Sequence, residues 1–186
     1  MQKSRVTVMM LAMVTLITLI SFKLVNDRSE VAKTEAMVAD WERAKAYTLE
    51  YLNAATEEAI AFKPTTEMRT LGQQMLHLAE ANYGFASTAS GKTSPVTFGQ
   101  LEKASDNYKS KEALTKAVMD SYDFMISALK GTEASKMGES IKMFNRFDMS
   151  REVAFQKAFE HQTHHRGQTT VYLRLNGIQP PNEKLF

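Results

Sequence analysis

Hydrophobic residues recur at three- and four-residue steps along most of this chain from about residue 31 onward. This spacing is the period of an amphipathic α-helix, and it predicts four helical segments. They begin near residue 31, near Thr70, before Leu114 and at Ser150, and the last one runs to Asn176. No segment shows a convincing strand period. Two long connections, 92–109 and 132–149, separate the later helices.

Local signals place the ends of these helices. Proline disfavours a helical residue before it, so the segment 62–66, which contains Pro64, should interrupt the first helix. Thr70 and Gln73 have the spacing of a capping box. A lysine followed by Gly131 suits a helix end with a left-handed glycine. Four amphipathic helices within one domain predict an all-α fold, a four-helix bundle, and the long loops leave room for crossover connections.

The first thirty residues have a different character. Lys3 and Arg5 precede an uncharged apolar run at 6–22. A basic start and an apolar run have the form of a secretory signal, but no clear cleavage site follows. The run is close to the shortest that spans a membrane, and it is apolar on every face, unlike a core helix. We therefore predict a signal peptide or, preferably, an N-terminal membrane anchor at 1–30. The domain at 31–186 would then lie outside the cytoplasm, in the cell envelope.

Composition removes several classes of function. The 23 basic and 21 acidic residues are interspersed and give a net charge of +2, so no footprint for nucleic acid is present. The absence of cysteine excludes disulfides, thiolate metal ligands and a cysteine nucleophile. The sequence contains no glycine-rich phosphate loop and no nucleophile elbow.

The histidines carry the candidate chemistry. Three of the four lie within five residues, and His161 and His165 are separated by one helical turn on the apolar stripe of the last helix. Imidazole is the commonest protein ligand for transition metals, so this pair with His77 from the second helix predicts a three-nitrogen metal site with room for a substrate. His164 remains an alternative to His165. Hydrogen-bonded core histidines without metal are the other interpretation.

Other metal motifs fail on the residues present. A metalloprotease of the zincin type needs glutamate directly after the first histidine, where this chain has Gln162. A ferritin-like dinuclear centre needs Glu-x-x-His, and His77 and Glu80 stand in the reverse order. The pattern that remains is one mononuclear, all-histidine site.

Two motifs resemble one family specifically. Gln74-Met-Leu-His77-Leu-Ala, together with His161-Gln-Thr-His-His165-Arg-Gly-Gln168, is similar to the motifs of the DinB/YfiT-like family of metal-binding helical bundles. The Thr-His-His-Arg-Gly-Gln core and the Leu-Arg-Leu-Asn-Gly run that follows are the most specific parts.

This resemblance covers roughly residues 35–176. It implies an up-down-down-up four-helix bundle, often a homodimer, and a divalent metal held by His77, His161 and His165. Zinc or nickel is typical of the family, and three imidazoles also suit iron(II) or copper(II). The N-terminal hydrophobic segment departs from the usual cytoplasmic members.

The resemblance also implies a function. Such a site would activate a thiol or a water molecule for transfer to, or hydrolysis of, a small electrophilic molecule, with a low-molecular-weight thiol as partner. The alternative is a non-catalytic metal-binding or stress-associated bundle in which the metal is structural. A fourth coordination position open to solvent favours the enzyme, and a closed one favours the structural role. The pattern assigns no catalytic residue.

Further polar and aromatic residues near the histidines have two interpretations each. Three polar residues one turn from the ligands could orient an imidazole or simply lie at the bundle edge: Gln73, Glu80 and Gln168. Glu160 could be a general base, and Arg166 could bind an anionic substrate group or have a structural role. Three aromatic residues could line the pocket or belong to the core: Tyr83, Phe85 and Tyr172.

Overall fold

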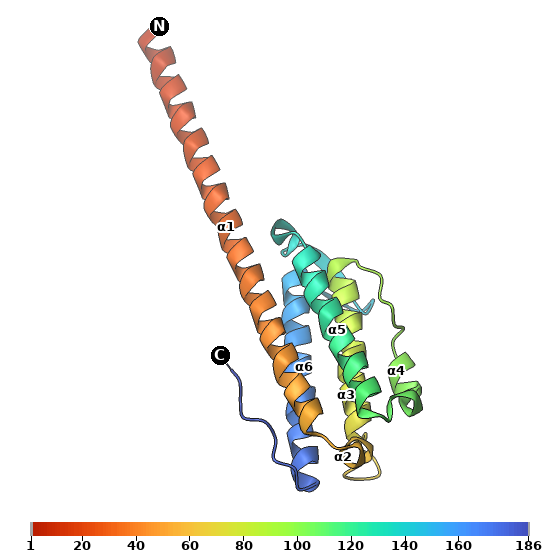
Figure 1. Cartoon of the computed structure of the whole chain (residues 1–186). Helices are drawn as coiled ribbons and strands as arrows, with labels where there is room; N and C mark the ends of the chain where they lie inside the picture. The colour runs from red at the N-terminus through yellow and green to blue at the C-terminus, as the bar shows by residue number, and fades with distance from the viewer. Residues whose placement is uncertain (1, 186) are drawn as a thin grey trace.

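The computed structural model describes residues 2–185 (Figure 1). The side chains of residues 2–12, and of several others up to residue 26, lie outside this description. The chain is mostly helical. Its four long helices are α1 (Gln2–Ala54), α3 (Leu71–Ser90), α5 (Lys111–Gly131) and α6 (Arg151–Leu175). The shorter elements are α2 (Glu57–Ala61), α4 (Gln100–Lys103), the 3-10 turns η1 (Ser105–Tyr108) and η2 (Ala134–Lys136), and the strands β1 (Ser140–Met143) and β2 (Phe147–Ser150).

The four long helices pack side by side. Helix α3 contacts both α5 and α6, and α1 contacts the same two helices from the other side. In Figure 1, α1 and α6 run in one direction, whereas α3 and α5 run in the other. The connection from α3 to α5 therefore returns along the length of the domain, and α4 lies within it (Figure 1).

The ends of the helices can be compared with the capping residues predicted from the sequence. Thr70 and Gln73 form the expected capping box, with hydrogen bonds of 3.1 and 3.0 Å. Ser150 caps α6 by accepting a hydrogen bond from the backbone N–H of Val153. Helix α5 ends at Gly131 as expected, but the predicted left-handed glycine there is wrong, because the next residue, Thr132, closes the helix in an extended conformation.

Helix α1 differs from its prediction at both ends. It is continuous from Gln2, so the predicted boundary at residue 30 falls inside a helix that extends well beyond the other helices (Figure 1). It stops at Ala54, before the proline segment, and α2 starts after the side-chain cap of Thr56. Among the residues whose side chains the structure describes, no helix is both long enough and apolar enough to cross a membrane. The predicted signal or anchor falls largely on side chains outside the description and stays a prediction.

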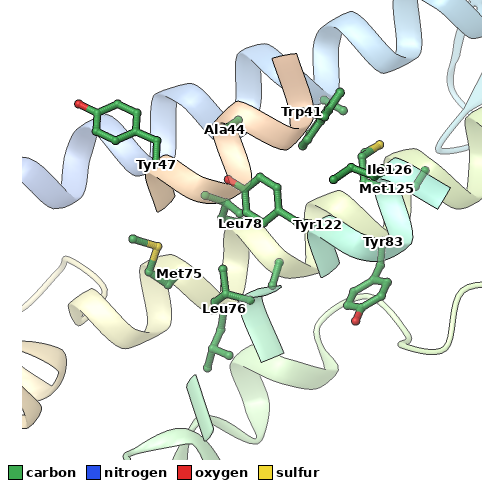
Figure 2. Packing of buried hydrophobic residues seen from close by; sticks show 14 of the residues in the cluster. Trp41, Ala44, Tyr47, Met75, Leu76, Leu78, Tyr83, Tyr122, Met125 and Ile126 are labelled. Carbon is green, nitrogen blue, oxygen red and sulfur yellow. The ribbon is translucent and has the colours of Figure 1, made fainter. Parts of the chain in front are cut away.

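The core is built around large aromatic side chains. Trp41, Tyr122, Phe155 and Tyr172 are the bulkiest fully buried residues (Figure 2 shows the first two). The Trp41 ring lies edge-on to Tyr122 at 5.8 Å and to Phe159 at 5.5 Å between ring centroids. Edge-to-face pairs add about 0.5–1.5 kcal/mol to the burial of their area. These contacts hold α1, α5 and α6 in fixed register.

The prediction that no strand exists is wrong. Strands β1 and β2 form an antiparallel hairpin in which Ser140 pairs with Ser150 and Met143 with Phe147. The turn residues Phe144 and Asn145 have φ values of 51° and 56°. Four-residue strands are too short for a visible alternation, and the turn lacks the glycine that usually marks such hairpins.

Candidate metal centre

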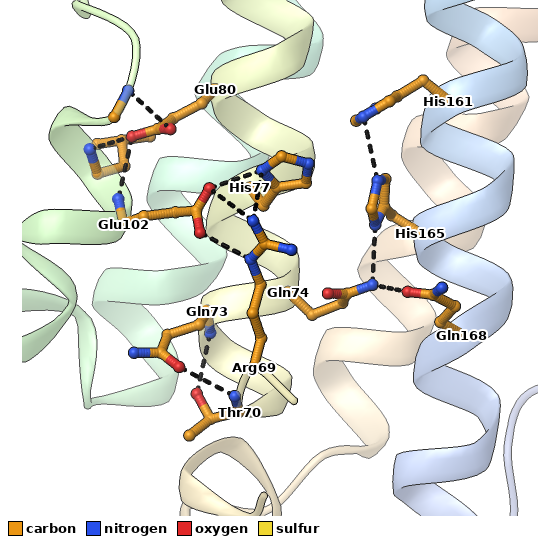
Figure 3. A network of polar contacts seen from close by, with 12 residues as sticks. Arg69, Thr70, Gln73, Gln74, His77, Glu80, Glu102, His161, His165 and Gln168 are labelled. Carbon is orange, nitrogen blue, oxygen red and sulfur yellow. Dashed lines mark hydrogen bonds and ion pairs between the residues drawn. The ribbon is translucent and has the colours of Figure 1, made fainter. Parts of the chain in front are cut away.

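Helices α3 and α6 bring three imidazole rings together. His77 faces His165 and His161 across the gap between the helices, at 4.6 and 5.3 Å between ring centroids (Figure 3). The centroids of His161 and His165 are 4.2 Å apart. One candidate ligand atom from each residue lies within 4.8 Å of the others. Nitrogens held tetrahedrally at about 2.0–2.1 Å from a zinc ion are about 3.3 Å apart, so small ring rotations suffice for all three to bind.

The hydrogen bonds indicate which nitrogens are free to bind a metal. The Nδ1 atom of His77 lies 2.6 Å from a carboxylate oxygen of Glu102, which leaves Nε2 for an ion. The Nε2 atoms of His161 and His165 face each other at 3.0 Å. The Nδ1 atom of His165 lies 2.8 Å from the Gln74 side chain. His77 and His165 therefore hold an outer partner at Nδ1 and leave Nε2 for a metal, the usual division, and Nε2 of His161 faces that of His165.

The Gln74 side chain bears on the tautomer of His165. The Gln74 amide nitrogen lies 2.8 Å from Nδ1 of His165, and in this orientation it pairs with the tautomer that carries its proton on Nε2. A metal at that Nε2 needs the proton on Nδ1 instead. A half-turn of the Gln74 amide would present its oxygen to Nδ1–H and stabilise that tautomer. The buried Nδ1 of His161 has no hydrogen-bond partner among the described residues.

The surroundings keep two of the imidazoles neutral. Burial, followed by the charges of His77 and His164, lowers the pKa of His161 to about 4. Burial, followed by the charges of His161 and His77, lowers the pKa of His165 to about 3. A neutral ring has a lone pair to give, so both side chains are ready to bind a metal at neutral pH.

Glu102 is the outer partner of His77. Burial alone would raise the pKa of Glu102, but hydrogen bonds from Arg69 and His77 outweigh it and hold this pKa below its ordinary value. Arg69 donates from Nε to the carboxylate at 2.7 Å (Figure 3). The carboxylate is therefore ionised, and it fixes both the tautomer and the orientation of the His77 ring. A carboxylate–histidine pair of this kind raises the basicity of a metal ligand.

Glu80 holds the segment that carries Glu102. Its carboxylate is buried and accepts hydrogen bonds from the backbone N–H groups of Gly99 and Glu102, both at 3.0 Å, and from that of Leu101. These three donors lie at the start of α4. Glu80 is thus one helical turn after His77 and positions its partner indirectly.

Comparison with known proteins agrees with this arrangement. The sequence model of the DinB family matches residues 30–185. The chain belongs to the DinB family. Its structure is similar to that of a DinB-like protein from Bacillus cereus, with 20% identity, a TM-score of 0.67, and coverage of 81% of this chain and 97% of that one. A DinB-like protein from Bacillus subtilis gives 16% identity, a TM-score of 0.60, and coverage of 81% and 96%. No curated protein matches the chain.

The resemblance inferred from the motifs is therefore confirmed, and the DinB domain brings together the three histidines that the motifs singled out. His164 lies outside the cluster: it is exposed, and its Nε2 contacts the Gln168 amide at 3.0 Å. Gln168 in turn accepts a hydrogen bond from Gln74. The pair Gln74 and Gln168 thus links His164 to His165.

Other sequence-based interpretations are now decided by contacts. Gln73 serves the capping box, so it orients no imidazole. Glu160 is exposed and pairs with Lys157 at 2.7 Å. Tyr83 and Tyr172 are buried in the core, whereas Phe85 is half-buried with its ring centroid 6.0 Å from that of His161.

Arg166 has a structural role. Its Nη1 donates to Oε1 of Gln162 at 3.1 Å, and the same oxygen accepts from the Tyr122 hydroxyl at 2.9 Å. The guanidinium carbon lies 4.5 Å from the centroid of the Tyr47 ring. All four side chains are buried. The histidine motif therefore has two faces, one towards α3 with His161 and one towards the core with Arg166.

Two functional residues were missed from the sequence. Glu102 lies in a connection, 25 residues after His77, and no local pattern marks it as a partner. Gln74 stands in the motif beside His77, but its contact to His165 crosses between helices. Only the packing of α3 against α6 reveals either role.

The Glu102→Gln variant is expected to bind a divalent metal about 10–100-fold more weakly than the parent DinB domain, because it loses the charged partner of His77. Zinc affinity measured by chelator competition checks this. The matched control is Glu160→Gln, an exposed glutamate close to His161 in sequence but paired only with a lysine. Equal affinities for the two variants would contradict the role given to Glu102.

The metal-free protein is expected to lose stability as the pH falls from about 6.5 towards 4. Both histidines have a folded-state pKa below the ordinary value of 6.5, so the unfolded chain binds more protons in this window. Each could contribute up to about 1.4 kcal/mol per pH unit. Partial exposure reduces this, and we expect about 1 kcal/mol per unit for the pair.

Urea unfolding in the presence of a chelator, at pH 6.5 and pH 5.0, measures this slope. A double variant, His161→Gln with His165→Gln, should show a distinctly flatter dependence over the same interval. Parallel slopes for parent and double variant would mean that these two rings are not the groups taking up protons on unfolding.

Proposed function

We propose that this DinB-family domain binds one divalent metal, zinc or nickel, through Nε2 of His77, His161 and His165. The metal would serve to activate a small thiol or a water molecule against a small electrophile, in transfer or hydrolysis. The observation that carries the proposal is the convergence of three ring nitrogens within 4.8 Å from two helices. When bound, such a metal supplies a Lewis acid that lowers the pKa of a coordinated thiol or water.

The chain's own residues support this role in two ways. The pKa values of His161 and His165 lie well below neutrality, so these rings do not repel a cation at pH 7. The anionic Glu102 lies directly behind His77 and partly offsets the charge of an ion. Three protein ligands leave at least one coordination position of a tetrahedral ion for a substrate.

Access to the site favours a small-molecule role over a purely structural metal. The His77 side chain retains 18% of its exposure, and His161 is half-buried. The histidine cluster therefore lies at the edge of the helix packing, within reach of solvent. A structural zinc site is normally closed by a fourth protein ligand.

The order of the helix directions and the cellular location of the protein are also part of the proposal. We infer an up-down-down-up four-helix bundle, supported by the helix directions in Figure 1 and by the long connection that carries α4. A cell-envelope location is supported only by the apolar run at 6–22. Membrane fractionation tests this location. The full chain should be found in the membrane fraction, whereas a fragment of residues 31–186 should not.

Cobalt-loaded protein provides the test of function. Titration with 2-mercaptoethanol should give a saturable thiolate-to-cobalt absorption band with the parent chain and none with the His161→Ala variant. If no thiol binds, and metal removal lowers the melting temperature by many degrees, the metal is structural and the alternative function holds.

A further inference from the structure

Phe144 occupies an unusual position at the tip of the hairpin. Its φ of 51° is in the left-handed region, where a bulky side chain is uncommon and sterically unfavourable. The following residue, Asn145, suits such a turn, and asparagine or glycine is the ordinary choice at both positions. An aromatic residue is therefore held here by contacts outside the turn rather than by the turn itself.

Those contacts join three separate segments. The Phe144 ring lies edge-on to Phe85 of α3, at 5.1 Å between centroids, and lies 6.5 Å from Phe98 in the connection after α3. A Cβ atom at Gly84 would lie 3.4 Å from Cε1 of Phe144, so the ring lies directly against the α3 backbone. We name these three rings, Phe85, Phe98 and Phe144, the aromatic wall.

The aromatic wall adjoins the candidate metal centre. The Phe85 ring centroid is 6.0 Å from that of His161. The His161 centroid in turn lies 4.2 Å from that of His165 and 5.3 Å from that of His77. The wall also stays open to solvent, since Phe144 is 47% exposed and Phe98 68%. Single exposed apolar residues are ordinary, but three rings gathered from three segments beside a ligand cluster form an apolar surface with a specific place.

We propose that the aromatic wall binds an aromatic or bulky apolar group of the small molecule that this site takes. This inference rests on the proposed function, because the metal-binding atom of that molecule must sit at the histidines. Its apolar group can then reach the wall at Phe85, whose ring centroid lies 6.0 Å from that of His161. The substrate class is thus a small thiol or electrophile with an aryl group next to its reactive atom.

The physical chemistry of the wall favours an aryl group over a polar one. Covering exposed phenylalanine carbon with another apolar group removes both surfaces from water. Three rings at mutual angles also offer edges and faces to a fourth ring, which adds a preference for an aromatic partner. Together these effects predict a binding preference of about 10-fold or more for an aryl ligand over a small polar one.

Two thiols of similar acidity measure this preference. Cobalt-loaded protein is titrated with benzyl mercaptan and with 2-mercaptoethanol, and the ratio of their dissociation constants is read from the thiolate-to-cobalt band. We expect benzyl mercaptan to bind at least about 10-fold more tightly in the parent chain. In Phe144→Asn, which keeps a residue suited to the left-handed turn, the ratio should fall to about 2–3, with cobalt affinity unchanged.

The matched control is Phe147→Thr. Phe147 is 50% exposed and lies on the same hairpin, but its ring packs against Arg146 instead of the wall. It should leave the ratio at the parent value. Phe98→Ser, outside the hairpin, should lower the ratio like Phe144→Asn and shows that the effect does not come from a disturbed turn.

Each outcome has one meaning. A parent ratio near one, with both thiols binding, overturns the aromatic wall while the proposed function stands. A high ratio that neither Phe144→Asn nor Phe98→Ser lowers places the preference elsewhere and also overturns it. Binding of neither thiol to the cobalt-loaded parent contradicts the proposed function itself, and the inference about the wall falls with it.

Discussion

The His161→Ala variant is expected to bind a divalent metal more than about 100-fold more weakly than the parent chain while remaining a folded helical protein. A four-ligand structural zinc site is worth about 10–16 kcal/mol, so one ligand carries on the order of 3 kcal/mol. The fold should tolerate the change, because His161 is only half-buried and its Nδ1 has no partner among the described residues. Elemental analysis after dialysis, with circular dichroism for helicity, measures both.

His164→Ala is the matched control for this variant. His164 is a histidine of the same turn of α6, but it is exposed, its Nε2 contacts the Gln168 amide, and its ring lies edge-on to that of His165. Its replacement should change the metal affinity by only a few-fold. Full metal occupancy in His161→Ala, or loss of metal in His164→Ala alone, would show that the ligands are assigned to the wrong ring.

The Glu80→Ala variant is expected to lower the free energy of unfolding by about 3–4 kcal/mol and to weaken metal binding about 10-fold. Glu80 accepts three backbone hydrogen bonds at the start of α4, and hydrogen bonds to a charged group contribute about 1.5–3 kcal/mol each, not additively. Its loss would leave buried donors without partners and would release Glu102 from His77. Urea unfolding and chelator competition give the two numbers.

The two expected effects of Glu80→Ala report on different roles. The loss of unfolding free energy reports a structural role, and the loss of metal affinity reports that Glu80 positions Glu102. Glu160→Ala, which removes an exposed glutamate paired only with Lys157, should change the unfolding free energy by less than about 1 kcal/mol. If Glu80→Ala is destabilised but binds metal as tightly as the parent, the position of Glu102 beside His77 does not depend on the anchoring of α4 by Glu80.

The helices and their caps could be predicted because they depend on neighbours in sequence. The period of apolar residues indicates α3, α5 and α6, and the capping box at Thr70 marks the start of α3 within one residue. The pairing of His161 with His165 is equally local, since one helical turn separates them. That His77 faces this pair was an inference from the resemblance and from bundle geometry, and the packing of α3 on α6 confirms it.

The parts that were missed depend on contacts between distant segments. Glu102 reaches His77 only because Glu80 anchors the start of α4, and nothing near Glu102 in the sequence marks that link. The hairpin turn at Phe144 contradicts its own local preferences and is stabilised by rings from elsewhere. Such features follow from tertiary packing and cannot be found from periodicity or turn residues.

The histidine motif itself could be interpreted only in part. His161 and Gln162 are adjacent in sequence but have different surroundings. His161 belongs to the histidine cluster, whereas Gln162 accepts buried hydrogen bonds from Tyr122 and Arg166. Both sets of contacts lock α6 in one orientation. Arg166, for which the sequence also allowed an anionic substrate group, therefore has a structural role within the packing of α6.

The most direct test of the central claim is anomalous diffraction from crystals of the zinc-loaded chain, recorded on both sides of the zinc absorption edge. The account predicts one strong peak about 2.0–2.1 Å from Nε2 of each of His77, His161 and His165. A peak that lacks any one of these three nitrogens, or the absence of a zinc peak between α3 and α6, would contradict it.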